Sequence, residues 1–291
     1  MPNVALSWQA AALLGLACVA FATAAPRLFP RGGRVLLNVA PFGREVGIIL
    51  GLYALWQVAG GLSLGHTGEA VNRGHWVWRT ERAWHFPNEA AMQRPILDHP
   101  IVVQICNIYY ATMHFGMLLG VLLWLYVRHR EAYRRTRTLI VLTTTACLLV
   151  GLVPVAPPRL IGVGMVDTAA LYGQSVYAVT AQFGADQYSA MPSVHVAWAV
   201  LIAVAVILAT RSRLRWLILL HTAATLYVVT VTANHFWLDG VVAVGLLAVS
   251  FVVQEVSRTL FARSHLARRA HLDREIPDAD VLALPDRAPT R

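Results

Sequence analysis

The chain has 291 residues, of which 57% are hydrophobic and only 13% are charged, with a formal net charge of +9. A soluble domain carries about 25% charged residues, so the composition excludes a disordered chain, a nucleic-acid-binding tail and an ordinary cytosolic enzyme. The basic residues are all arginine and lie in short clusters between long apolar stretches. These features predict an all-α protein that crosses a membrane several times, with no nucleic-acid partner.

Seven stretches are apolar and long enough, or nearly so, for the roughly 20 residues of a membrane-spanning helix. They cover residues 4–25, 46–64, 101–127, 138–156, 193–210, 215–233 and 236–257. The first differs from a signal peptide because no basic residue precedes it, and Arg27 is the first charge. We therefore expect about seven transmembrane helices, the first of them retained.

Three parts follow from this pattern. Residues 1–45 form an extra N-terminal helix and a cytoplasmic loop, and residues 46–257 form a catalytic membrane domain of six helices. Residues 258–291 form a polar tail without apolar periodicity, which we expect to be disordered.

The arginine distribution predicts the orientation of the helices. Segments 26–45, 128–137 and 211–215 are rich in arginine, whereas segments 65–100 and 157–192 together hold five arginines and six acids. Because positive loops stay in the cytoplasm, the N-terminus lies outside and the C-terminal tail lies inside a multi-pass cell-membrane protein. Segment 65–100 mixes tryptophan, arginine and glutamate, which predicts short helices lying flat on the outer surface.

The segment VTANHFWLDG, residues 231–240, carries the first candidate site residues. His235 and Asp239 are four residues apart, so on a helix that starts here they occupy the same face. A carboxylate that binds one imidazole nitrogen fixes the tautomer and makes the other nitrogen a better nucleophile. The alternative is a structural histidine at the membrane interface, capped by the aspartate.

The segment SAMPSVHVAW, residues 189–198, predicts a helix start. Pro192 suits a first turn, and Ser189 or Ser193 suits the N-cap. The free N–H groups of a helix N-terminus suit a phosphate, and His195 would stand beside it to give or take a proton. The alternative is ordinary capping with a surface histidine.

Arg159 follows two prolines where the fourth apolar stretch ends. A guanidinium at this place can bind two phosphate oxygens at once. The alternative is an arginine whose long side chain reaches the membrane interface and has no further role.

The chain carries an arginine, then P-S-x-H and then H-x-x-x-D, each at the outer end of a successive hairpin. This pattern resembles that of the type 2 phosphatidic acid phosphatase superfamily. Within it the chain is most similar to the inositol phosphorylceramide synthase-like branch. The resemblance implies that His235 is the nucleophile and forms a phosphohistidine, that Asp239 orients it, and that His195 protonates the leaving oxygen. It also implies that Arg159 and Ser193 bind phosphate, with no cofactor and no metal.

The chain departs from the ordinary phosphatase pattern at two places. Leu152 stands where those members have a lysine, and Val228 and Val229 stand where they have a Ser-Arg pair. The synthase-like branch also lacks that pair. The loss of cations weakens the inference that the substrate is a simple phosphomonoester.

A polar stripe lies in the third apolar stretch. Asn107, Tyr110 and His114 recur at helical spacing, and intramembrane polar side chains seldom face lipid. Contact with a head group or an acceptor is one interpretation, and hydrogen bonding between helices is the other.

The function expected is phosphatase or phosphotransferase activity at the outer membrane face, on a lipid phosphate or diphosphate. The phosphoryl group then passes to water or to a lipid alcohol, and the sequence leaves this choice open. The alternative is a lipid transporter or flippase without chemistry.

Overall fold

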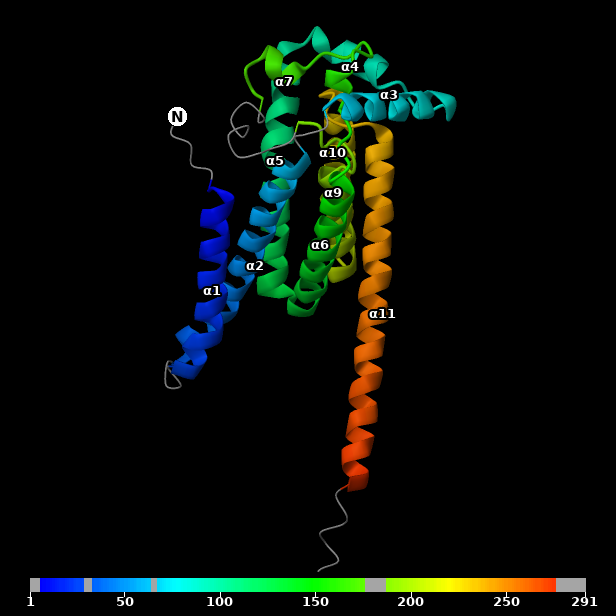
Figure 1. Ribbon diagram of the computed structural model, residues 1–291. Helices are drawn as coiled ribbons and strands as arrows, with labels where there is room; N and C mark the ends of the chain where they lie inside the picture. The colour runs from blue at the N-terminus through cyan, green and yellow to red at the C-terminus, as the bar shows by residue number, and fades with distance from the viewer. Residues whose placement is uncertain (1–5, 29–32, 64–66, 176–186, 276–291) are drawn as a thin grey trace, which may run out of the picture. The chain divides into compact units, whose positions relative to one another are not determined.

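The computed structural model describes residues 6–28, 33–63, 67–175 and 187–275 (Figure 1). It divides the chain into two units, residues 1–250 and 251–291. The helices are α1 (Trp8–Leu28), α2 (Gly33–Ser63), α3 (Thr67–Ala83), α4 (Glu89–Leu97), α5 (Pro100–Arg128), α6 (Arg130–Gly151), α7 (Thr168–Leu171), α9 (Val194–Ala209), α10 (Ile218–Val231) and α11 (Trp237–Glu275), with the short 3₁₀ helices η1 (Pro158–Leu160) and η3 (Arg213–Leu217).

The expectation of an all-α membrane helix bundle is confirmed. A helix occupies each of the seven apolar stretches, and the described residues contain no strand beyond one isolated bridge between Val155 and Ser189. Within the described part of the chain, five helices are long and apolar enough to cross a membrane, in the segments Trp8–Ala25, Val39–Val58, Pro100–Arg128, Arg213–Val231 and Trp237–Ser264. The helix α9 is apolar apart from His195 in its first turn, but it has only 16 residues.

Two boundaries differ from those expected. The predicted cytoplasmic loop 26–45 is helical from Gly33 onward, because α2 starts there and continues through Pro41. The predicted disordered tail is helical as far as Glu275, because α11 continues beyond its apolar part into charged sequence. The rest of that tail, residues 276–291, lies outside the described residues.

The segment that follows α2 forms two short helices, as expected. Figure 1 shows α3 running across the bundle at the end where α4 and α7 also lie. The Asn88 side chain caps α4 by accepting hydrogen bonds from the amides of Ala90 and Ala91. Together α3 and α4 form a cap over one end of unit 1.

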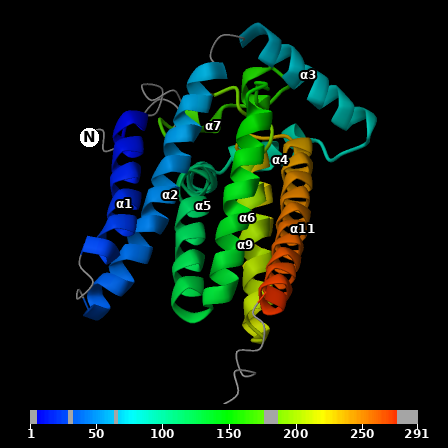
Figure 2. The same ribbon diagram turned by 60° about the horizontal axis from the view of Figure 1, so that its bottom comes forward.

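The helix α9 lies at the centre of unit 1, against α5, α6 and α10 (Figure 2). Its buried face alternates small and branched side chains, among them Ala197, Leu201 and Ile202. Small residues let helices approach closely in a membrane, where lipid tails offer no hydrophobic driving force for association. This close packing fixes the start of α9, where His195 lies.

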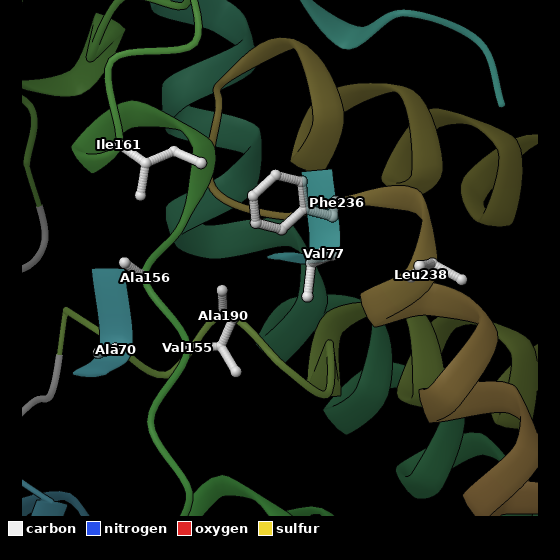
Figure 3. Packing of buried hydrophobic residues seen from close by; sticks show 8 residues of the cluster. All are labelled: Ala70, Val77, Val155, Ala156, Ile161, Ala190, Phe236 and Leu238. Carbon is white, nitrogen blue, oxygen red and sulfur yellow. The ribbon is translucent and has the colours of Figure 1, made fainter. Parts of the chain in front are cut away.

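An apolar cluster lies under the cap and joins segments that are distant in sequence (Figure 3). It holds α3, the chain before and after η1, the chain before α9 and the start of α11 together. Its buried members are Ala70, Val77, Val155, Ala156, Ile161, Ala190, Phe236 and Leu238. Three of the segments that carry predicted site residues are therefore packed on one apolar base.

Candidate active site

His235 lies in the turn between α10 and α11, two residues before the first residue of α11. Ala233 has a φ of 57°, and the Asn234 side chain donates to Thr232 Oγ1 over 2.8 Å, so the turn is held by its own residues. His235 is thus not on the helix itself, in contrast to the expectation. Asp239 still reaches it from the first turn of α11, with Nδ1 and Oδ2 3.3 Å apart.

The hydrogen bonds of His235 determine its tautomer. Its Nδ1 lies 2.7 Å from the Ala190 carbonyl oxygen, closer than to Asp239. A carbonyl oxygen can only accept, so Nδ1 carries the proton and donates it to Ala190 and Asp239. The Nε2 atom then has a free lone pair; it is buried and has no hydrogen-bond partner among the described residues.

His195 lies in the first turn of α9, and its ring centroid is 5.5 Å from that of His235. Ser193 is the N-cap of α9, and its hydroxyl accepts from the Val196 amide over 3.4 Å. The Ser193 amide donates to the Asp239 carbonyl over 3.1 Å, which ties the start of α9 to the start of α11. The structure therefore brings both predicted histidines together.

The Arg159 side chain is buried among the described residues. Its side chain is 4% exposed and forms an ion pair of 3.4 Å with Asp167. Its Nη1 donates to Asn234 Oδ1 over 2.6 Å, and its amide donates to the Ala233 carbonyl over 3.1 Å. These contacts place the guanidinium beside the residue that precedes His235.

The α5 stripe separates into two parts. The Tyr110 ring stacks on His195 with centroids 4.4 Å apart, and the His114 ring meets His195 edge-on at 4.2 Å. Asn107 instead donates to the Thr168 carbonyl over 3.1 Å and accepts from its hydroxyl over 2.9 Å. Tyr110 and His114 are thus next to a candidate catalytic histidine, whereas Asn107 joins α5 to α7.

A family model described as the PAP2 superfamily matches residues 75–253, which is more than half of the chain. The chain belongs to the PAP2 superfamily. Membership supports a phosphatase-type activity on lipid phosphates. No curated protein and no solved structure gives a significant match.

For this PAP2 superfamily member, the structure adds residues that the sequence interpretation missed. The Ala190 carbonyl oxygen is the hydrogen-bond partner that lies closest to His235 Nδ1. The Asn234 side chain accepts a hydrogen bond from Arg159. Sequence could not identify the carbonyl, because any residue supplies one. Asn234 had a signal, since it stands next to His235 in a buried turn where an amide must find partners.

Proposed function

We propose that this PAP2 superfamily protein is a metal-independent lipid-phosphate phosphatase or phosphotransferase that works through a phosphohistidine on His235. The observation that carries the proposal is the free Nε2 of His235, with Nδ1 held by Ala190 and Asp239. A buried nitrogen with a free lone pair, next to a second histidine, suits nucleophilic attack with acid catalysis.

In the first step Nε2 attacks phosphorus, a P–N bond forms, and the bond to the leaving oxygen breaks. His195 gives its proton to that oxygen. The positive charge that develops on His235 is stabilised by the Ala190 carbonyl and the Asp239 carboxylate. In the second step His195 removes a proton from water or an alcohol, whose oxygen attacks phosphorus, and the P–N electron pair returns to Nε2.

Arg159 and Ser193 are the proposed phosphate-binding residues. The Arg159 guanidinium is buried beside Asn234, where little water screens its charge. Ser193 caps α9, whose N-terminus carries a partial positive charge. These groups supply the positive field that a transferring phosphoryl group needs.

The proposed specificity is that of the inositol phosphorylceramide synthase-like branch, with a lipid phosphate or diphosphate as donor. Tyr110 and His114 stand against His195 and are the residues we expect to meet a head group or a lipid alcohol. Asn107 acts through α7 rather than directly, since Thr168 engages its amide.

The proposed orientation places this site at the outer face of a cell membrane and the C-terminal tail in the cytoplasm. It rests on the arginine-rich segments 26–45, 128–137 and 211–215. Labelling of single cysteines introduced into these segments in intact cells would test it. Labelling by a membrane-impermeant reagent without permeabilisation would contradict it.

The test of activity uses the purified chain in detergent with a panel of lipid phosphates, lipid diphosphates and phosphatidylinositol, each with and without lipid alcohols. His235→Ala should abolish product formation, whereas His99→Ala, an exposed histidine at the start of α5, should leave it unchanged. Phosphate released without an acceptor indicates a phosphatase. Product formed only with an alcohol indicates a transferase.

Two further results would contradict the proposal. If EDTA removed the activity and zinc or magnesium restored it, the mechanism would require a metal; we expect no effect of EDTA and inhibition by vanadate. If the whole panel gave no product while the chain moved lipids between the leaflets of vesicles, the protein would be a transporter or flippase.

A further inference from the structure

Two glutamates in the cap are fully buried close to the candidate active site. Glu81 of α3 is 0% exposed and Glu89 of α4 is 1% exposed. Arg82 is the cation that contacts them in the described part of the chain: its Nη2 lies 2.8 Å from Glu89 Oε2 and 3.9 Å from Glu81 Oε2. One guanidinium thus faces two carboxyl groups.

Glu81 contacts the helix that starts after His235. Its Oε1 accepts a hydrogen bond of 2.6 Å from the Leu238 amide, in the first turn of α11. Trp237, the residue before Leu238, also contacts this region, because its indole N–H donates to the Pro87 carbonyl over 3.0 Å. The end of α3 and the segment that follows it therefore hold the turn of α11 that carries Asp239.

The other oxygens of this pair have no donor. Glu81 Oε2 and Glu89 Oε1 are both buried, and neither has a hydrogen-bond partner among the described residues. Two ionised carboxylates can only accept hydrogen bonds, so neither can donate one to the other. A hydrogen bond between Glu81 and Glu89 therefore requires a proton on one of them. A proton on Glu81 would supply a donor and remove one of two buried negative charges.

The electrostatic surroundings favour the protonated form of Glu81. The pKa of Glu81 is raised to about 9, mainly by burial and further by the Glu89 carboxyl, with which a protonated Glu81 can form a hydrogen bond, and by the negative charges of Glu89 and Asp239. The Leu238 amide acts against them. The charged groups facing Glu81 are Arg82 on α3, Glu89 on α4 and Asp239 on α11.

We propose that Glu81 and Glu89 share one proton, and that protonated Glu81 is a positioning residue that sets His235 and Asp239 through the first turn of α11. Glu81 touches no substrate in this scheme. Its hydrogen bond with the Leu238 amide fixes the start of α11. Its neutral form adds no negative charge near Asp239, which already has Glu89 as a negative neighbour. The positioning role rests on the proposed function, whereas the shared proton does not.

The shared proton predicts a pH dependence of stability. The folded protein keeps a proton on Glu81 that the unfolded chain releases above the ordinary pKa of 4.5. The stabilisation is therefore complete below that pH and is lost as the pH rises toward about 9. Over this interval the equilibrium constant for unfolding should rise about tenfold per pH unit from this group alone.

The first experiment observes the proton without any activity assay. Infrared difference spectra at neutral pH compare the wild type with Glu81→Gln, which keeps an acceptor for Leu238 and gives Glu89 a donor. We expect Glu81→Gln to lose a carbonyl band of a protonated carboxylic acid. Glu69→Gln, an exposed carboxylate on the same helix, should lose none.

The same three proteins, unfolded in detergent between pH 5 and pH 9, give the second readout. Glu81→Gln should gain stability over the wild type as the pH rises, and Glu69→Gln should follow the wild type. An unchanged infrared spectrum, or equal pH slopes for Glu81→Gln and the wild type, would overturn the shared proton.

The positioning role is tested by phosphate release from dioleoylphosphatidic acid. In the wild type kcat should fall above about pH 9. Glu81→Gln should keep its kcat there, and Glu81→Ala should lower kcat at every pH without raising KM. If Glu81→Gln and Glu81→Ala both had the kcat of the wild type at every pH, the positioning role would be overturned. A wild type with no activity on any lipid would contradict the proposed function and leave the proton test intact.

Discussion

The hairpin α1–α2 and the helices α3–α11 of the family region use polar and small residues in different ways. In the hairpin, glycines bring two backbones together: a Cβ on Gly47 would lie 2.6 Å from Val19 Cγ2 and 2.8 Å from the Gly15 carbonyl oxygen. In the family region, buried polar side chains converge on His235 and His195. Close packing alone thus makes a membrane hairpin, whereas a site needs polar groups fixed by other polar groups.

Removing His195 from the family region should lower kcat more than the other substitutions below, because His195 is the proposed proton donor. General acid catalysis contributes about 10²–10⁴-fold, so His195→Ala should lower kcat by that factor. The loss should shrink for a donor with a phenolic leaving group, which departs without a proton. Steady-state kinetics on a lipid phosphate and an aryl phosphate measure both. An equal loss on the two donors would contradict the assignment.

Neutralising Asp239 should have a smaller effect. Ala190 already holds the His235 tautomer at 2.7 Å, whereas Asp239 lies at 3.3 Å. Asp239→Asn therefore removes the negative charge beside His235 but leaves the His235 tautomer unchanged. Hydrogen bonds to charged groups contribute about 1.5–3 kcal/mol, so kcat should fall about 10- to 10²-fold. A loss as large as that of His235→Ala would mean that Asp239, and not Ala190, sets the tautomer.

Sequence reasoning reached the helical fold because apolar runs of membrane length have few alternatives. It also found the residues that meet at the site, because His195 and His235 stand at helix starts and carry chemistry in their side chains. It could not find the Ala190 carbonyl, which any residue would provide. Glu81 was missed for a different reason: α3 carries six charged or amide side chains, a pattern typical of a surface helix, and only the structure shows that Glu81 is buried.

A glycine-to-alanine substitution should have different consequences in the two regions. A Cβ on Gly74 of α3 would lie 2.6 Å from the Ala156 carbonyl oxygen, in the chain that leads to Arg159. Overpacking costs about 1–3 kcal/mol, so Gly74→Ala and Gly47→Ala should both destabilise the chain. Only Gly74→Ala should also lower kcat. A misplacement of the reacting groups by 1 Å costs about 10²-fold, and we expect a smaller loss here.

The control for this pair is Gly151→Ala at the end of α6, where an added Cβ would meet no atom within 4 Å. It should change neither the melting temperature nor kcat. Thermal unfolding and kinetics on the same three preparations separate the outcomes. A fall in kcat in Gly47→Ala as large as in Gly74→Ala would show that the hairpin helps to position the site.

The smallest effect is expected where the hairpin meets the family region. Glu45 of α2 accepts a hydrogen bond of 2.9 Å from the Tyr133 hydroxyl and also pairs with Arg137, both on α6. Tyr133→Phe removes the first bond and leaves the Glu45 charge paired. A hydrogen bond contributes about 0.5–1.5 kcal/mol net, so the unfolding free energy should fall by that amount with kcat unchanged. A lower kcat in Tyr133→Phe would mean that α2 acts on the site through α6, and the division between a packing hairpin and a catalytic bundle would not hold.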